Sequence, residues 1–160
     1  MQLDPHTCWM ITRSMETVVL RMQQATQTAS RLAHWLQQTH GGLIERVYHP
    51  ELELEAVYQA VYQRQCTGAG STFSIVLRGG RAAAFAFING LRLFCSAVSL
   101  GGSESLVCHP ASTTHSGVPA GQREADGVVE GLVRLSIGLE HADDLQADLD
   151  QALRRCAAGG

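Results

Sequence analysis

The sequence predicts an α+β fold: a short, mostly antiparallel sheet covered by helices and preceded by a long helix. Residues 72–77 (TFSIVL) and 132–139 (LVRLSIGL) carry apolar side chains at every second position, which is typical of strands with one buried face. Residues 17–38 instead repeat apolar side chains at steps of three and four, the spacing of an amphipathic helix. Strands separated by helices and short turns favour a layered α+β (or α/β) architecture.

Turn-forming residues set the element bounds in the first half of the chain. Asp4-Pro5 begins a helical segment, Gly41 and Gly42 end the long helix, and Pro50 closes a short strand. The turn TGAGST before the next strand looks superficially like a phosphate-binding loop, but it lacks the required lysine, so we interpret it as a turn. The predicted elements are helices at 4–13, 17–38 and 54–65 and strands at 43–49 and 72–77.

The second half is divided by glycine pairs and by one polar stretch. The alanine-rich segment after Gly80 is apolar nearly all round, so we expect a buried helix that ends at Gly90. Residues 110–127 are too polar for the core. Asp143 at the start of the last helix and Arg155 at its end suit the helix dipole. The predicted elements are helices at 81–89 and 142–155 and strands at 91–96, 104–108 and 132–139.

Composition excludes several classes of protein. The 160 residues suffice for one ordinary domain, and the net charge of -3 indicates neither a nucleic-acid nor a membrane partner. No apolar run reaches the roughly 18 residues of a membrane span, and the start MQLDPHTC shows no export signal, so we expect a cytoplasmic protein. Five single cysteines and histidines without ligand spacing argue against a disulfide framework and a metal site.

Three motifs occur in the last third of the chain: SLGGSESL at 99–106, HPASTTH at 109–115 and GLVRLSIGLE at 131–140. In this order and spacing they resemble the C-terminal domain of the pyridoxal-phosphate (PLP) enzymes of cysteine and methionine metabolism, which include cystathionine γ-synthase, cystathionine γ-lyase and methionine γ-lyase. RSMETVVLRM at 13–22 is similar to the family's linking helix. The resemblance implies the small C-terminal domain of a fold type I PLP enzyme: residues 1–16 would end the large domain, and 17–160 would form the small domain with its linking helix 17–40.

Arg134 stands out without any family knowledge. The period of two in its strand places Arg134 on the face opposite Val133 and Leu135, away from the expected core. The planar guanidinium suits a carboxylate held by two hydrogen bonds. Pairing with a nearby acid such as Glu104, or plain solvation, is the alternative. The resemblance implies that Arg134 binds the α-carboxylate of an amino-acid substrate.

Ser99 and Leu100 complete the predicted substrate-binding residues. The resemblance implies that Ser99 lies beside the PLP ring and helps to hold the carboxylate, which also makes it a candidate cofactor contact; the alternative is an ordinary turn serine. Val98 replaces a Glu that is usual in cystathionine γ-synthases and γ-lyases, which favours a methionine γ-lyase-like or sulfhydrylase-like specificity. We interpret His109 and His115 as residues that brace a loop, with no catalytic role.

The sequence contains no lysine: its twelve basic residues are all arginine. PLP chemistry requires a lysine amine, so we predict that this chain has no catalytic residue, holds no covalent PLP and is inactive alone. The predicted function is the substrate-carboxylate-binding portion of a PLP-dependent C-S lyase or transferase of sulfur amino-acid metabolism (trans-sulfuration), as a truncated homologue or fragment. A non-catalytic binding module, or one subunit of a split enzyme, remains the alternative. Expected partners are the amino-acid substrate and either further copies of the chain or a complementing large-domain chain.

Overall fold

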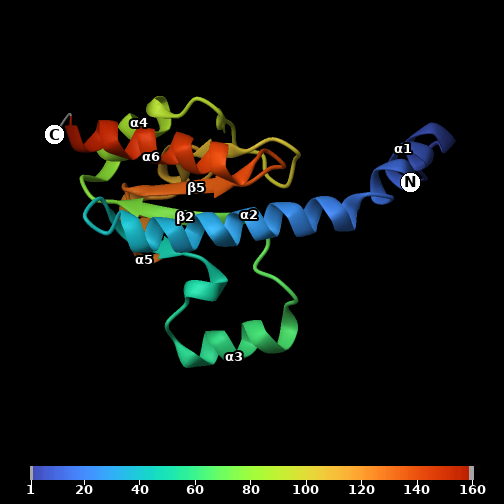
Figure 1. Ribbon diagram of the computed structural model, residues 1–160, viewed down its shortest axis with the longest axis horizontal. Helices are drawn as coiled ribbons and strands as arrows, with labels where there is room; N and C mark the ends of the chain where they lie inside the picture. The colour runs from blue at the N-terminus through green and yellow to red at the C-terminus, as the bar shows by residue number, and fades with distance from the viewer. Residues whose placement is uncertain (1, 159–160) are drawn as a thin grey trace.

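A computed structural model describes residues 2–158 and contains a five-stranded sheet with helices packed on one face (Figure 1). Every neighbouring pair of strands is antiparallel except β3 and β4, which are parallel. The predicted α+β fold with a mostly antiparallel sheet is therefore confirmed. Across the sheet, the strands are β1 (Ile44–Tyr48), β2 (Thr72–Leu77), β5 (Leu132–Ser136), β4 (Leu106–Cys108) and β3 (Cys95–Ser96).

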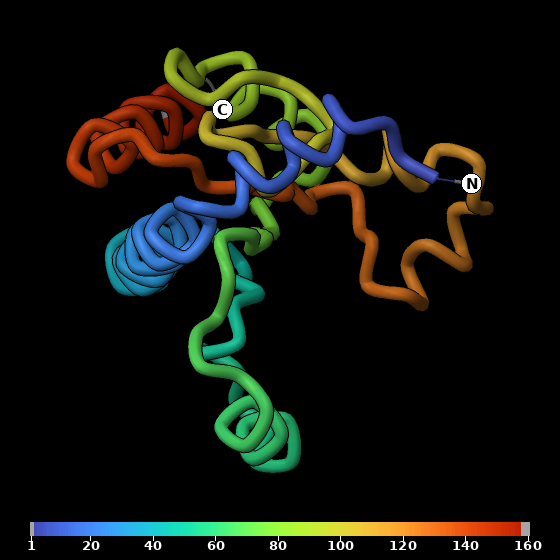
Figure 2. Tube along the Cα trace, turned by 90° about the vertical axis from the view of Figure 1, so that its right-hand side faces the viewer, coloured from blue at the N-terminus to red at the C-terminus, as the bar shows by residue number. Residues whose placement is uncertain are grey.

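The core lies between one face of this sheet and three helices, α2 (Val18–Thr39), α4 (Gly80–Gly90) and α6 (Ala142–Ala158). Every second residue of a strand points into this core. Residues paired directly across antiparallel strands share a face, so the core residues of β2, β5 and β4 lie side by side. The strands contribute Phe73, Ile75, Val107, Val133 and Leu135, and the helices contribute Ala29, Leu32, Leu36, Ala84, Phe87, Leu145, Leu149 and Leu153. The sheet's other face is left free of these helices, as Figure 2 shows with α2 and α6 gathered on one side of the strands.

Two further helices lie outside this layer. Helix α1 (Pro5–Met15) is capped by the Asp4 carboxylate, which accepts a hydrogen bond from the Thr7 amide at 3.0 Å, and the bonds from Thr7 lower the pKa of Asp4. It projects beyond the end of α2, and α3 (Ala56–Gln65) hangs below the sheet on two connecting segments (Figure 1). Neither helix contains a buried residue.

The predicted strand 91–96 was wrong in length, because only Cys95 and Ser96 pair in the sheet. The amides of Arg92 and Leu93 instead donate to the buried carboxylate of Asp148 on α6, at 3.0 and 2.8 Å. An amide N–H that donates to a side chain is not available to donate to a neighbouring strand. The sequence pattern could not show this competition, since Asp148 lies more than 50 residues away.

Two other expectations require correction. Helix α4 is buried on one side only: Ala84 and Phe87 are in the core, whereas Phe85 is 37% exposed because it lies on the outward face. The stretch 110–127 is not wholly outside the core, since Pro110 and Ala111 are buried. It also contains two short helices that its polar composition did not predict, η2 (Pro110–Ser112) and α5 (Ala120–Ala125). A 3-10 turn, η1 (Pro50–Leu52), follows β1.

The backbone of another segment approaches closely at Gly138, just after β5. A Cβ there would lie 2.5 Å from the carbonyl carbon of Glu104 and 2.5 Å from the carbonyl oxygen of Ser103. The amide of Gly138 donates to Ser105 Oγ at 2.9 Å, and that hydroxyl donates to Glu140 Oε2 at 2.7 Å. Any side chain at position 138 would therefore force apart the end of β5 and the segment that precedes β4.

Replacement of Gly138 with alanine is expected to lower the free energy of unfolding by about 3 kcal/mol, the upper range for forced overpacking. Urea denaturation followed by circular dichroism measures the change. Gly41→Ala is the matched control, because a Cβ at Gly41 meets nothing within 4 Å. Equal stabilities of the two variants would contradict the close approach.

Candidate substrate-carboxylate site

Arg134 lies in the middle of β5, directly between Ser74 of β2 and Cys108 of β4. Its side chain extends from the face opposite the helical core and is partly exposed. Nη2 donates to the carbonyl oxygen of Ser99 at 3.1 Å and also to the carbonyl oxygen of Val98. Within residues 2–158 no carboxylate forms an ion pair with Arg134, so the alternative pairing with Glu104 is absent there.

The segment 97–101 passes across the end of the Arg134 side chain. Val98 and Leu100 expose 48% and 56% of their surface, so apolar packing holds little of it in place. Gly101 adopts the left-handed conformation, with φ of 75°, and its amide donates to Ser136 Oγ at 3.1 Å. The structure thus brings Arg134 and the backbone of Ser99 together, and places Leu100 on the adjacent exposed turn.

Ser136 is a residue of this site that sequence reasoning did not single out. It is 1% exposed and lies two positions after Arg134 on the same face of β5. The period of two along the strand was the available signal, because it places Arg134 and Ser136 on one face. The hydrogen bond from Gly101 gives that serine its role, and only the folded chain shows it.

His109 braces its loop, in agreement with the sequence interpretation. Its Nδ1 lies 2.8 Å from Ser112 Oγ and its Nε2 lies 2.9 Å from the carbonyl oxygen of Glu130, so both ring nitrogens are engaged. The ring is 2% exposed. The imidazole Nδ1 of His115 lies 2.8 Å from Oγ1 of the neighbouring Thr114, and the His115 amide donates to the carbonyl oxygen of Pro110 at 2.9 Å. Neither imidazole is hydrogen-bonded to Arg134 or Ser99.

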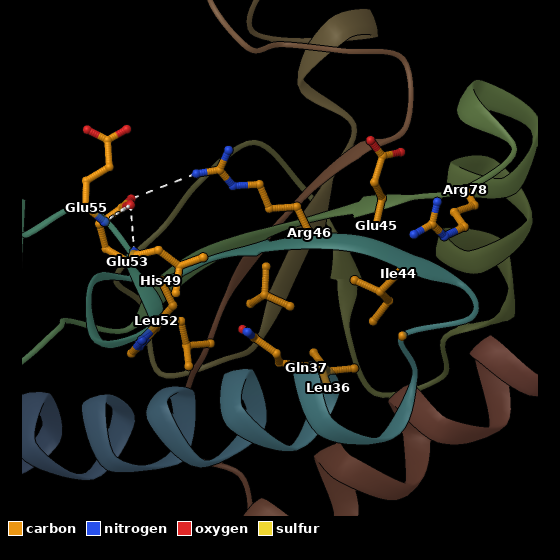
Figure 3. A pocket seen from close by; sticks show the side chains of 13 residues that line it. Leu36, Gln37, Ile44, Glu45, Arg46, His49, Leu52, Glu53, Glu55 and Arg78 are labelled. Atoms are coloured by element: carbon orange, nitrogen blue, oxygen red, sulfur yellow. Dashed lines mark hydrogen bonds and ion pairs between the residues drawn. The ribbon is translucent and has the colours of Figure 1, made fainter.

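A groove of about 550 Å³ lies at another place, along the outer edge of β1 (Figure 3). Two of its charged groups, Arg46 and Glu53, already have partners. Arg46 lies 4.0 Å from Glu53 and over the ring of Tyr48, and Glu53 Oε1 accepts hydrogen bonds from the amides of Leu54 and Glu55. Neither Arg134 nor Ser99 lines this groove. The carboxylate-binding candidate therefore lies on the sheet face opposite the helices, separate from the groove.

The residues present do not fit covalently bound PLP. A Schiff base needs a lysine amine, and the sequence has none. The turn 67–70 that superficially resembled a phosphate loop borders the beginning of α2, and none of the residues around it is Arg134 or Ser99.

In the described part of the chain, no three His, Cys, Asp or Glu side chains are close enough to hold a metal ion. None of the helices within residues 2–158 has the length and apolar character needed to cross a membrane.

Comparison with solved structures defines the class of fold. Cystathionine gamma synthase from Xanthomonas oryzae pv. oryzae, solved in complex with aminoacrylate and cysteine, matches 91% of this chain with a TM-score of 0.83 and 42% sequence identity. The match covers 37% of that chain. The sheet with its helical cover is therefore the fold of part of a PLP-dependent enzyme.

The chain belongs to the Cys/Met metabolism PLP-dependent enzyme family, whose model matches residues 1–154. Cystathionine beta-lyase MetC of Bacillus subtilis is 39% identical over 97% of this chain, and L-methionine gamma-lyase of Pseudomonas deceptionensis is 42% identical over 97%. The chain spans 39% and 38% of the length of these two relatives. Full-length members of the family use PLP, so the absence of lysine separates this chain from the complete catalytic unit.

His49 is a buried histidine that lines the groove along β1, outside the carboxylate site (Figure 3). It is 4% exposed, its ring lies edge-on against Phe73, and its Nδ1 accepts a hydrogen bond from the Glu51 amide at 3.3 Å. Burial lowers the pKa of His49 below its ordinary value of 6.5, and this effect outweighs the opposing influence of the Glu51 carboxylate. The fold therefore favours the neutral imidazole.

The lowered pKa of His49 predicts how stability depends on pH. Below pH of about 6.5 the unfolded chain protonates His49 while the folded chain resists, so stability present at neutral pH is lost as the pH falls. We expect the free energy of unfolding to fall between pH 7 and pH 5 with a slope of at most about 1.4 kcal/mol per pH unit from this group. His49→Gln should make the slope shallower, whereas replacement of the exposed His6 by Gln should retain the wild-type slope. Identical slopes in all three proteins would refute the assignment.

Proposed function

We propose that this chain forms the substrate-carboxylate-binding wall of a PLP-dependent C-S lyase or transferase acting on a sulfur amino acid or an activated homoserine. The observation that carries the proposal is Arg134, a partly exposed central-strand arginine on the sheet face opposite the helices, without an ion pair among residues 2–158. Its guanidinium would neutralise the carboxylate and fix the orientation of the amino acid by hydrogen bonds. Ser99 and Leu100 would border the bound substrate, and Ser99 would also lie beside the cofactor.

The ligands of a solved relative support the chemical class of substrate. Cystathionine gamma synthase from Xanthomonas oryzae has been solved with aminoacrylate and cysteine and with cystathionine. Each of these molecules carries an α-carboxylate, the group that Arg134 is suited to bind. Val98 in place of the usual Glu further favours a methionine γ-lyase-like or sulfhydrylase-like specificity. Methionine gamma-lyases and an O-succinylhomoserine sulfhydrylase are among the relatives, at 35% to 42% identity.

The projecting helix α1 supports the proposed division of the chain. Residues 1–16 would be the end of the large domain, and 17–160 the small domain with its linking helix 17–40. Helix α1 contains no buried residue, and its apolar side chains are exposed together with those at the start of α2: Trp9, Met10, Ile11, Met15, Val19 and Leu20. Several large apolar side chains left exposed on two consecutive helices favour an interaction site there. We therefore include in the proposal a partner for this surface, either another copy of the chain or a chain that carries the cofactor lysine.

The chain by itself is expected to form no PLP adduct on any side chain. After incubation with PLP and reduction with borohydride, intact-mass spectrometry should find pyridoxyl only at the amino terminus, because no lysine amine is available. A stoichiometric adduct elsewhere would contradict the proposal. A chain carrying the cofactor lysine, added to the mixture, should restore the internal aldimine colour if this chain is one subunit of a split enzyme.

Free methionine is expected to bind the isolated chain weakly, with a Kd above about 10 mM, because an exposed ion pair contributes about 1 kcal/mol or less. Titration followed by the backbone amide signals of Ser99, Leu100 and Gly101 in nuclear magnetic resonance (NMR) spectra measures this contact in the wild type and in the variants. Arg134→Ala should abolish the remaining response, and replacement of the exposed Arg154 on α6 by Ala should leave it unchanged. Micromolar binding that depends on Arg134 would instead favour the non-catalytic binding module, and binding independent of Arg134 would contradict both functions.

A further inference from the structure

We propose that Arg134 is also a latch that holds the segment 98–101 against β5, and that a carboxylate bound at Arg134 opens this latch. In this proposal Ser136 is a positioning residue that keeps the end of the segment in place. The proposal rests on the proposed function in one respect, namely that a carboxylate binds to Arg134. It adds a movement of the Ser99 backbone that accompanies binding.

The hydrogen-bond geometry of the guanidinium carries the first step. A guanidinium offers two edges that can hold a carboxylate by two parallel bonds, one formed by Nε and Nη2 and the other by Nη1 and Nη2. Nη2 belongs to both edges. In this structure the two carbonyl oxygens of Val98 and Ser99 accept from Nη2, which has two hydrogens. Two-point binding of a carboxylate along either edge therefore requires at least one carbonyl to leave.

Few other contacts retain the segment once a carbonyl has left. Before it, the amide of Ala97 donates to the carbonyl oxygen of Val107 at 3.1 Å. At its end, the amide of Gly101 donates to Ser136 Oγ at 3.1 Å. Between these two points, the backbone of residues 98–100 forms hydrogen bonds only to Arg134 among the described residues. The exposed Val98 and Leu100 side chains add little packing. The segment is therefore fixed at both ends and latched in the middle by Arg134.

The competition between acceptors favours opening. The bonds from the ionised Arg134 to the two carbonyl oxygens are already charge-assisted, but a carboxylate adds a full opposite charge and can accept two parallel bonds from the guanidinium. A carboxylate also neutralises Arg134, which has no ion pair among residues 2–158. Chloride carries the same negative charge as a carboxylate but cannot accept two parallel hydrogen bonds from the guanidinium. The latch should therefore open with carboxylates and not with halides. Binding of a carboxylate should then move the backbone of Ser99 away from Arg134.

The experiment compares backbone order in residues 98–101 of the full chain with sodium acetate and with sodium chloride at equal ionic strength. NMR relaxation of ¹⁵N-labelled protein reports the order, and the Nε-H signal of Arg134 reports binding of acetate. We expect acetate, and not chloride, to cause a loss of order at Ser99 and Leu100. Arg134→Ala should show this loss without acetate and no further response, with unchanged signals from core residues such as Ile75 and Val133.

Ser136→Ala tests the positioning role separately. It removes the acceptor for the Gly101 amide, so order at Gly101 should already be lost without ligand while the acetate response at Ser99 persists. A shift of the Arg134 signal by acetate with an unchanged 98–101 segment would overturn the latch and retain the carboxylate-binding function. No shift of that signal even at saturating acetate would overturn the carboxylate function and, with it, the proposed opening. An ordered segment in Arg134→Ala would overturn the latch directly.

Discussion

The structure depends on the position of β5 between β2 and β4. Side chains of a strand alternate between the two faces of the sheet, and pairing along both edges of β5 fixes the backbone from which they project. Val133 and Leu135 pack beneath the helices with no exposed surface, and Arg134 and Ser136 face the other way. One strand therefore contributes both to the core and to the candidate site, and the rigidity of the core determines where the guanidinium lies.

Two carboxylates hold the loop segments next to the site by hydrogen bonds. Asp148 holds the amides of Arg92 and Leu93, and Glu140 holds both the amide and the hydroxyl of Ser105. Charge-assisted bonds of this kind are stronger than bonds between neutral groups. They fix the chain on both sides of the 98–101 segment while that segment itself is held mainly by β5. The site thus combines a fixed arginine with a lightly retained loop, the combination that a ligand-responsive contact requires.

Family membership and the absence of lysine together define what this chain can contribute. The family model and the relatives cover nearly the whole chain, yet the chain corresponds to less than two fifths of those relatives. PLP chemistry supplies its own electron sink and needs an enzymatic amine. In the proposed function this chain would contribute instead the Arg134 cation for a carboxylate and the exposed apolar side chains of α1 for a partner. The proposed function therefore concerns binding and orientation of a substrate, and leaves the chemical step to another chain or domain.

Periodicity and turn residues alone predicted the α+β class, the long helix 17–38, the strand 72–77 and the face occupied by Arg134; the predicted strand 132–139 was three residues too long, because β5 ends at Ser136. These features are local, because they depend on side-chain direction and on glycine and proline at element ends. The motifs added the family and the pairing of Ser99 with Arg134 in one proposed site. Tertiary structure decided the short β3, the half-exposed α4 and the role of Ser136. In each case the cause is a contact or a packing face supplied by distant residues, such as Asp148 beside Arg92, and no local pattern encodes which distant groups meet.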